Sequence, residues 1–444
     1  MSELFGGLQA AGGVREQLSD AAWVRAMLDA EAALAQSLAD AGRMDRSDAA
    51  AIAAACDATL YDVAELGRAS AAAGNPVVPL VRALTERAGT AGSSVHSGAT
   101  SQDILDTALM LVSRRALDVV VEDLARCADA VAALARDHIG TVQAGRTLLQ
   151  QAAPTTFGLT AAGWLSGLLA AQDALRHARG QFAVQLGGVV GTLAALGTDG
   201  PPVLANMARR LDLAEPVLAW HTERSRIAAF AGAVGQTAGT VAMITRSIML
   251  LAQTEVAELT EEGPPGSGGS STLPHKRNPV AAVLAAACAQ QAPGLVATLL
   301  SSMGHEHQRA AGSWHAEWQP VMELMRSTGS AVAWLLTSLQ RLRVHPDRMR
   351  RNVEDAGGLL NTECITSALT ASVGRLAAHD LVASCAHRAL AGEGSLLDLL
   401  AADPVIIAEI DRTRLHDLLD PEQYLGSAAE FVQRALDEYG RAKR

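Results

Sequence analysis

A short segment in the middle third of the chain joins a run of hydroxyl side chains to a cationic stretch that lies between two prolines. It runs from Gly268 to Pro279 and reads GGSSTLPHKRNP. A serine hydroxyl is a weak base unless its alkoxide is stabilised, and a lysine together with backbone N–H groups can provide that stabilisation. We therefore predict Ser270 as a catalytic base and Lys276 as its electrostatic partner.

The residues just before this segment predict a mobile loop over 261–273. The stretch 261–267 reads EEGPPGS, with few apolar side chains and several residues that interrupt helices. An interdomain linker is the alternative interpretation. A plain linker does not explain the cationic stretch 275–278, nor the Ala-rich helical run that Pro279 begins, so an anion-binding loop is favoured.

A second polar segment, VHSGATSQD at 95–103, lies where a loop meets the longest predicted helix. Helix N-termini present free N–H groups and favour anions, so Thr100, Ser101 and Gln102 could hold a substrate carboxylate. The alternative is that Thr100 or Ser101 only caps the helix, and the two roles can coexist. His96 belongs to the same predicted substrate-binding segment.

Two further polar segments are less specific. The stretch 145–156 places polar groups before a proline-initiated helix and reads as a connecting loop. The cluster 305–318 is rich in His and Glu, but ligands two apart on a helix point to different faces and no third ligand has a suitable spacing, so we expect no metal. A polar helix end and loop is one interpretation of this cluster, and Arg309 as an anion contact is the other.

Composition narrows the class of protein. With 444 residues, of which 49% are hydrophobic, the chain can form a large core and more than one domain. A formal net charge of −11 disfavours general binding to nucleic acid or to anionic membranes. The five cysteines are odd in number and widely separated, which favours reduced core residues over disulfides or a zinc site.

The chain starts without a basic leader, and we find no later stretch that stays apolar long enough to span a bilayer. We expect no export signal, no membrane anchor and a cytoplasmic location. There is also no Walker-type phosphate loop and no dinucleotide fingerprint in a strand-turn-helix unit.

Helical periodicity dominates, so the predicted fold class is all-α. Residues 101–139 contain no proline or glycine, and the first glycine after them is Gly140. Further long helical patterns cover 154–186, 221–260, 279–304 and 314–342. Small side chains with only 3% aromatics allow close helix packing in a long bundle. Helices that are apolar on more than one face indicate an oligomer.

The 269–279 segment matches, except at Leu273, the signature of the fumarase/aspartase superfamily, which the chain therefore resembles. Within it, the chain is most similar, nearly end to end, to the bacterial 3-carboxy-cis,cis-muconate cycloisomerase family. Supporting segments are 98–103, 154–159, 220–224, 253–256, 314–318 and 419–426.

This resemblance implies a helical subunit with three domains: an N-terminal helical domain over residues 1–100, a central long-helix bundle over 101–352 that carries the signature loop 261–279, and a C-terminal helical domain over 353–444. It also implies a homotetramer with active sites shared by three subunits, and no metal or organic cofactor. Ser270 matches the catalytic serine, and Lys276 and Asn278 match the substrate-binding pair. The full predicted substrate-binding set is His96, Thr100, Ser101, Gln102, Arg146, Thr147, Ser271, Asn278 and Arg309.

One departure bears on the reaction. Fumarases and adenylosuccinate lyases have histidine where this chain has Leu148, which cannot transfer a proton. A hydroxide or amine leaving group needs a general acid, whereas a carboxylate leaves as the anion. The resemblance therefore implies conversion of the small tricarboxylate 3-carboxy-cis,cis-muconate to 4-carboxymuconolactone, a step of the beta-ketoadipate pathway.

Two alternatives remain. Ser267, Glu223 and Gln308 differ from the residues expected in close relatives, which favours a lyase of the same superfamily that eliminates a good leaving group from a succinyl-type substrate to give fumarate. The other is a non-catalytic helical scaffold, which retention of Ser270, Lys276 and Asn278 disfavours.

Overall fold

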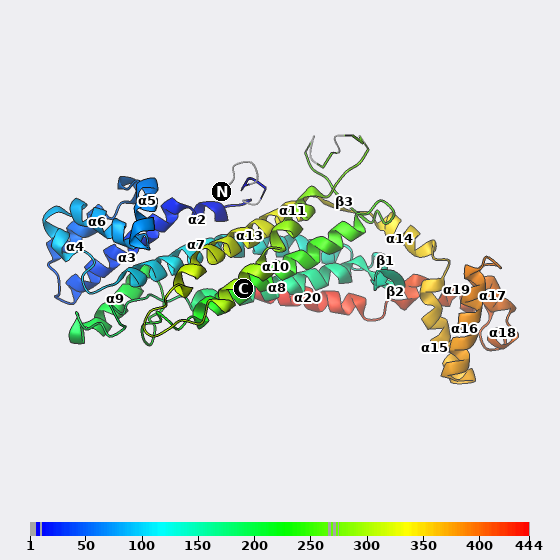
Figure 1. The fold of residues 1–444 in the computed structure, drawn as a ribbon. Helices are drawn as coiled ribbons and strands as arrows, with labels where there is room; N and C mark the ends of the chain where they lie inside the picture. The colour runs from blue at the N-terminus through cyan, green and yellow to red at the C-terminus, as the bar shows by residue number, and fades with distance from the viewer. Residues whose placement is uncertain (1–5, 9–10, 265–267, 270–271, 274, 444) are drawn as a thin grey trace. The chain divides into compact units, whose positions relative to one another are not determined.

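The computed structural model describes residues 6–8, 11–264, 268–269, 272–273 and 275–443, and these are mainly helical (Figure 1). Strands in the described residues form two small antiparallel sheets, β1–β2 and β3–β4. The all-α class predicted from the helical periodicity is therefore confirmed. Contacts within the chain group it into two compact units.

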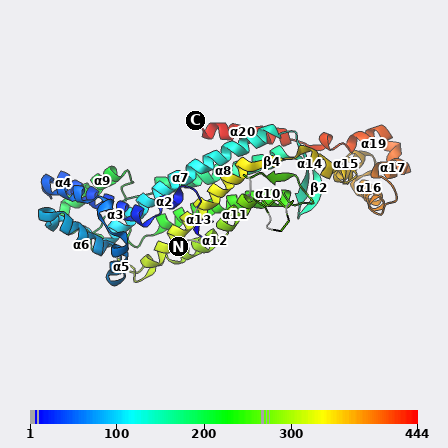
Figure 2. The same cartoon turned by 90° about the horizontal axis from the view of Figure 1, so that it is seen from above.

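The first unit comprises residues 1–125, 171–242 and 284–335. The elements that lie wholly within it are α2 (Val14–Gln17), α3 (Asp20–Asp40), α4 (Arg46–Ala55), η1 (Ala58–Leu60), α5 (Val63–Ala73), α6 (Val77–Arg87), η2 (Gly89–Ser94), η3 (Gly197–Asp199), α9 (Gly200–Leu211) and α12 (Ala292–Ser301). α3 packs against α4 and α9, as Figure 2 shows. Ser19 begins α3 because its side chain accepts a hydrogen bond from the Ala22 backbone N–H.

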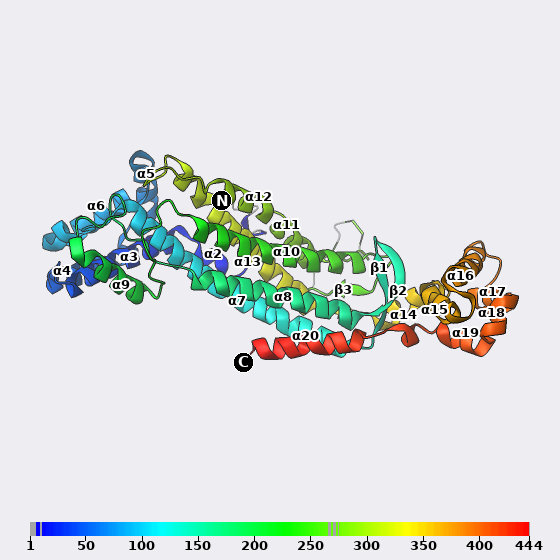
Figure 3. The ribbon, with the colours of Figure 1, turned by 90° about the horizontal axis from the view of Figure 1, so that it is seen from below.

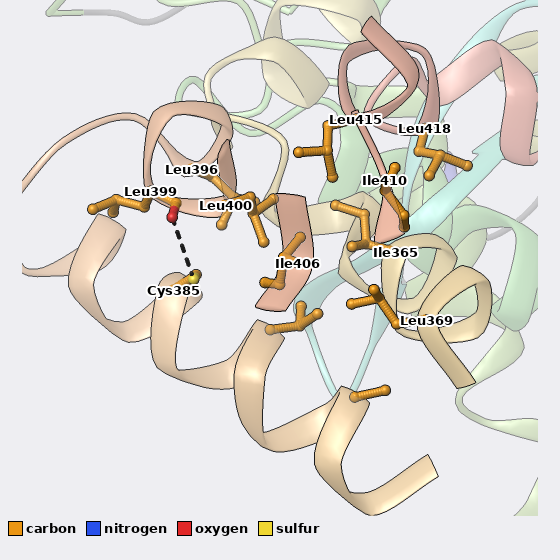
Figure 4. Packing of buried hydrophobic residues seen from close by; sticks show 12 residues of the cluster. Ile365, Leu369, Cys385, Leu396, Leu399, Leu400, Ile406, Ile410, Leu415 and Leu418 are labelled. Carbon is orange, nitrogen blue, oxygen red and sulfur yellow. Dashed lines mark hydrogen bonds between the residues drawn. The ribbon is translucent and has the colours of Figure 1, made fainter. Parts of the chain in front are cut away.

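The second unit comprises residues 126–170, 243–283 and 336–444. Its own elements are β1 (Val142–Thr147), β2 (Gln150–Thr156), β3 (Leu259–Glu261), β4 (Leu342–Val344), α14 (Pro346–Glu354), η4 (Leu359–Asn361), α15 (Thr362–Val373), α16 (Arg375–Leu390), α17 (Leu396–Ala402), α18 (Pro404–Glu409), α19 (Arg412–Leu418), η5 (Pro421–Tyr424) and α20 (Ala428–Ala442). Helices α15 to α19 gather around one hydrophobic core (Figure 3). In that core the Cys385 thiol lies 3.7 Å from the Leu399 carbonyl oxygen (Figure 4).

Five helices, four of them long, have residues in both units: α7 (Ser101–Asp137), α8 (Phe157–Gly180), α10 (Ser225–Leu251), α11 (Val280–Ala289) and α13 (Ser313–Arg341). They confirm the long-helix patterns of the sequence, except that the pattern over 279–304 is two helices, α11 and α12. The break occurs where Pro293 enters the first turn of α12, because proline cannot donate the hydrogen bond that would continue α11. The division into three domains at 100 and 352 stays a prediction.

The prediction of a connecting loop over 145–156 is wrong, because this stretch lies mostly in the β1–β2 hairpin. The expectation that no stretch stays apolar long enough to span a bilayer also needs correction. Two helical regions, Ser225–Leu251 and Val280–Ser301, are long and apolar enough to cross a membrane, although core helices of bundles share this property. The five cysteines are free, and three of them are buried.

Candidate functional site

The N-terminus of α7 is organised by one buried carboxylate. Asp103 accepts hydrogen bonds from the backbone N–H of Thr100 at 3.0 Å, of Gly187 at 3.0 Å and of Gly188 at 2.9 Å. Its Oδ1 also pairs with His221 Nε2 at 2.7 Å. The first turn of α7 is thus tied to two later segments of the same unit, and its N-terminal end is fixed in place.

α7 begins at Ser101, so Thr100 occupies the N-cap position that the sequence predicted. The carboxylate of Asp103 reaches back to the Thr100 N–H, which is the acidic half of a capping box. Thr100 and Ser101 are partly exposed at this positive end of the helix dipole. Thr100 is thus at the N-cap and Ser101 is the first helical residue, and binding of a carboxylate by the two remains a proposal.

Gln102 and Arg309 are already engaged by protein groups. The Gln102 amide donates to Asp106 at 3.1 Å and to the His221 carbonyl at 2.8 Å. Arg309 donates to the Gly188 carbonyl at 3.0 Å and, weakly, to the Gln102 side-chain oxygen at 3.4 Å. Partial burial lowers the pKa of Arg309. Both side chains hold neighbouring segments in this structure.

His96 lies in the segment that leads into α7, in a left-handed conformation with φ of 59°. Its Nδ1 is 2.6 Å from a carboxylate oxygen of Glu31, which is buried on α3. Burial opposes the charged ring, but the hydrogen bond with Glu31 and the negative charges of Glu31 and Asp103 together outweigh it and raise the pKa of His96. The ring is therefore held ready to carry positive charge near the α7 N-terminus.

One turn into α7, a buried arginine joins two carboxylates. Arg224 donates to Asp106 at 2.8 Å and to Glu317 at 2.6 Å, and its guanidinium lies over the Trp220 ring at 4.9 Å. Trp314 donates its indole N–H to Asp106 at 3.0 Å. We call Asp106, Arg224 and Glu317 the buried ion cluster. Sequence reasoning did not assign it.

The charges of the buried ion cluster depend on one another. Burial disfavours charge at each group, but the two carboxylates raise the pKa of Arg224, and Arg224 lowers the pKa of Asp106. Burial prevails at the other carboxyl and raises the pKa of Glu317. His305 Nε2 lies 3.2 Å from Glu317, without hydrogen-bond geometry to any described residue.

Residues 302–312 form a loop between α12 and α13, in agreement with the expected polar helix end and loop. Because residues 305–309 are not helical, helical spacing gives no ground for excluding a metal there. Among the residues that the structure describes, no group of three or more His, Cys, Asp or Glu side chains could hold a metal ion. The absence of a metal in the working protein stays a prediction.

In the second unit, Arg146 on β1 is paired with a fully buried carboxylate. Its Nη2 lies 2.5 Å from one oxygen of Glu258, and its Nη1 lies 3.1 Å from the other. Gln143 and Asn352 also donate to Glu258, at 2.7 and 2.8 Å. This two-point pairing fixes the orientation of the guanidinium and balances its charge locally.

The β1–β2 hairpin ends in two exposed leucines. Thr147 pairs with Gln150, and Leu148 and Leu149 connect them with φ of 51° and 65°. Positive φ at both central residues is the pattern of a type I′ turn, which asparagine and glycine normally provide. Leu148 is 97% exposed at the tip of this hairpin.

The signature loop is tied at its base. The Glu261 carboxylate accepts hydrogen bonds from the Ala281 and Ala282 N–H groups at 2.9 and 3.1 Å, which caps α11. Asn278 donates its backbone N–H to the Gly268 carbonyl at 2.9 Å and its side-chain amide to the same oxygen at 3.1 Å. The two ends of the loop therefore meet. Ser270 and Ser271 lie outside the described residues.

The predicted site residues thus fall into two groups. His96, Thr100, Ser101, Gln102 and Arg309 belong to the first unit, and Arg146, Thr147, Lys276 and Asn278 belong to the second. Lys276 and Thr147 are exposed. The contacts given above join residues of the same unit.

Comparison with known proteins gives matches along almost the whole chain. A family model described as Lyase matches residues 9–294, and one described as Adenylosuccinate lyase C-terminus matches residues 358–435. A 3-carboxy-cis,cis-muconate cycloisomerase of Pseudomonas aeruginosa is 43% identical, over 99% of this chain and 96% of that protein. A nitrosuccinate lyase of Streptomyces davaonensis is 41% identical, over 99% of this chain and 96% of that protein. The crystal structure of 3-carboxy-cis,cis-muconate lactonizing enzyme from Pseudomonas putida matches with a TM-score of 0.93 and 40% identity, over 100% of both chains.

Proposed function

We propose that this chain, which belongs to the lyase family of the fumarase/aspartase superfamily, is a cycloisomerase that converts 3-carboxy-cis,cis-muconate to 4-carboxymuconolactone. The observation that carries this function is the end-to-end similarity of about 40% to several cycloisomerases of that name. A substrate carboxylate adds to the conjugated diene acid and forms the C–O bond. The displaced electron pair resides on the aci-carboxylate, which then takes a proton at carbon.

Ser270 is proposed as the group that exchanges this carbon-bound proton. As alkoxide it removes the proton in the lactone-opening direction, so as hydroxyl it delivers the proton when the lactone forms. Lys276 is proposed to stabilise the alkoxide, and Asn278 and Ser271 to bind substrate. The side chain of Lys276 is exposed at the closed base of the signature loop, which supports its role in stabilising the alkoxide.

The carboxylates of the substrate need positive partners. The α7 N-terminus with Thr100 and Ser101 supports one carboxylate position, because helix N-termini attract anions. Arg146 carries a charge that Glu258 already balances, which supports a role in orienting substrate rather than in adding net charge. The exposed Lys276 and Arg277 are proposed to supply further positive charge.

Loss of the diene absorbance in the presence of purified protein tests the reaction. Ser270→Ala is expected to lower kcat by at least about 10³, within the range for a lost general acid or base. Ser301→Ala on α12 is the matched control, because this exposed serine is not among the predicted site residues, and it should retain activity within about threefold. Absence of turnover by the unsubstituted protein would exclude the reaction, and an active Ser270→Ala would exclude the proposed base.

A second candidate function is elimination of a good leaving group from a succinyl-type substrate to give fumarate. Leu148 permits this reaction as well as the first, because a leucine at the hairpin tip cannot protonate a leaving group, and nitrite leaves without protonation. The 41% identical relative named nitrosuccinate lyase supports the same class. Release of fumarate from nitrosuccinate, with no lactone from the muconate, would replace the first function by this one.

We propose a homotetramer with active sites shared between subunits. Met243 and Leu250 on α10 and Val283 on α11 are exposed large hydrophobic side chains of the second unit, which supports burial against another copy. Mixing Ser270→Ala subunits with Arg146→Ala subunits should restore some of the activity if sites combine groups from different subunits. If the mixtures stay inactive and the mass in solution is that of a monomer, the shared site is wrong.

A cytoplasmic location, with neither nucleic acid nor membrane as partner, is proposed on the negative net charge and on the enzyme family. We also propose that the reaction needs no metal or organic cofactor. Activity that persists after dialysis against a chelator would agree with this.

A further inference from the structure

Glu31 is a buried carboxylate that the proposed chemistry does not use. It lies on α3, is 1% exposed, and has a carboxylate oxygen 2.6 Å from Nδ1 of His96. Among the residues that the structure describes, no Lys or Arg side chain forms an ion pair with it. A buried carboxylate without a positive partner is strongly disfavoured. The imidazole of His96 is therefore the group placed to supply the positive charge.

The backbone around His96 also fixes the position of its ring. His96 adopts a left-handed conformation with φ of 59°, and its carbonyl accepts a hydrogen bond from the Ala99 N–H at 3.3 Å. This conformation is uncommon for a residue other than glycine and persists where surrounding contacts enforce it. The turn leads directly into α7, which begins at Ser101. The ring is thus held from two sides, by the turn and by Glu31.

The second ring nitrogen of His96 remains available. Nε2 has no hydrogen-bond partner in the described part of the chain, whereas Nδ1 is engaged by Glu31. The side chain is 18% exposed, and Nε2 is not one of the buried nitrogens that lack a partner, so solvent reaches this nitrogen. A cationic ring therefore gives one N–H to Glu31 and keeps the other for an anion.

We propose that Glu31 is a positioning residue: it keeps His96 protonated and oriented so that its Nε2–H donates to a substrate carboxylate beside Thr100 and Ser101. This role rests on the proposed function, which places a carboxylate at the α7 N-terminus. Glu31 acts through His96, because its own carboxylate is buried against Nδ1. The pair is neutral as a whole, so it adds a directed, charge-assisted donor to the helix N-terminus and no net charge.

The ionisable groups around the pair leave His96 free to titrate. Two negative charges act on its ring, from Glu31 on α3 and from Asp103 on α7. The Cys56 thiol and the Tyr61 phenol lie near Glu31, and burial raises the pKa of each to about 12. Both groups therefore stay neutral up to pH 9. Loss of the His96 proton removes the proposed donor, so carboxylate binding should weaken as the pH rises.

Calorimetric titration of the full-length protein with tricarballylate, an unreactive tricarboxylate, tests this role. Binding should weaken at least about tenfold between pH 6 and pH 9, as expected for the loss of a hydrogen bond to a charged group. In Glu31→Gln the midpoint of this weakening should move to lower pH by at least about one unit, because the opposite charge beside the ring is gone.

Two further variants assign the effect to the pair. Glu31→Asp keeps the negative charge and should move the midpoint less than Glu31→Gln does. Asp29→Asn is the matched control, because it makes the same carboxylate-to-amide change on α3 at a residue that pairs with Arg115 at 2.6 Å, and it should leave the midpoint unchanged. His221 keeps its partner Asp103 in all these variants, so a moved midpoint does not belong to that imidazole.

Kinetics separate positioning from a merely structural role. With the substrate that the chain turns over, Glu31→Gln at pH 8 should raise KM at least about fivefold and keep kcat within about threefold, because it weakens binding in the ground and transition states alike. A loss of folded protein would instead lower kcat and leave the midpoint in place.

The role of Glu31 is overturned if tricarballylate does not bind, if the midpoint stays in place in Glu31→Gln, or if Asp29→Asn moves it equally. If Glu31→Gln fails to fold, the double variant Glu31→Gln/His96→Gln, which removes both partners, decides, and a pH dependence that persists there overturns the role. Tricarballylate binding with the expected pH dependence, but without turnover of the muconate or of nitrosuccinate, would count against the proposed function alone.

Discussion

Replacing Arg224 by methionine tests whether the buried ion cluster behaves as one electrostatic unit. The side chains of Arg224, Asp106 and Glu317 are 0%, 2% and 1% exposed. Methionine fills much of the volume but leaves two buried carboxyls without a cation. Removing one partner of such a pair costs about 3–5 kcal/mol.

That cost converts to a shift of the melting temperature. The entropy of unfolding is about 2.1 cal/mol/K per residue, which for 444 residues gives roughly 0.9 kcal/mol/K. A loss of about 4 kcal/mol then lowers Tm by about 4 °C if the subunit unfolds as one cooperative unit. Differential scanning calorimetry at pH 7 measures this shift.

Two control experiments test whether the loss of stability is electrostatic. Arg412→Met removes an arginine from an exposed ion pair, where both side chains are 59% exposed, and should change Tm by less than about 1 °C. In an Asp106→Asn/Glu317→Gln background, Arg224→Met should cost less than half as much, because no buried carboxylate is left without its partner. A drop no larger than that of Arg412→Met, or equal in both backgrounds, refutes the electrostatic account.

Three further outcomes follow from the two groups of site residues. Glu258→Gln should lower Tm by about 3 °C in calorimetry, because it removes the buried charge that holds a guanidinium, and a change below about 1 °C would contradict this. His96→Gln should cost more stability at pH 5.5 than at pH 9. Because the pKa of His96 is raised in the folded protein, its pair with Glu31 stabilises the fold fully below about pH 6.5, and this stabilisation is lost as the pH rises through the folded pKa. Equal costs at the two pH values would contradict the pairing. Gly268→Ala should lower kcat at least about fivefold more than Gly42→Ala. Both glycines have φ near +70°, but only a Cβ added at Gly268 would meet a backbone oxygen, at 2.7 Å. Equal rates in the two variants would show that the loop base is not required for activity.

Features specified by neighbouring residues were predictable from the sequence. Ser19 and the apolar period after it placed α3, and the absence of glycine and proline after Ser101 placed α7, because capping and periodicity act over a few residues. The family could also be predicted from the signature segment, because its motif is formed by neighbouring residues.

Features that join distant segments could not be predicted from local patterns. Arg224 meets Asp106 across 118 residues and Glu317 across 93, and no local pattern specifies either pairing. The hairpin was missed for another reason, because Leu148 and Leu149 lack the turn chemistry of asparagine and glycine and only the flanking strand pairing holds them at positive φ.

The four contacts of Asp103 have a consequence for the order in which the protein matures during synthesis. α7 can form from its own sequence, but the partners of Asp103 at Gly187 and His221 lie 84 and 118 residues further along the chain. At about 5–20 residues per second, the ribosome supplies the last of them roughly 6–24 s after Asp103 itself. A nascent chain therefore carries a long helix whose N-terminal end is not yet fixed, and the carboxylate binding proposed there can begin only when that later sequence has arrived.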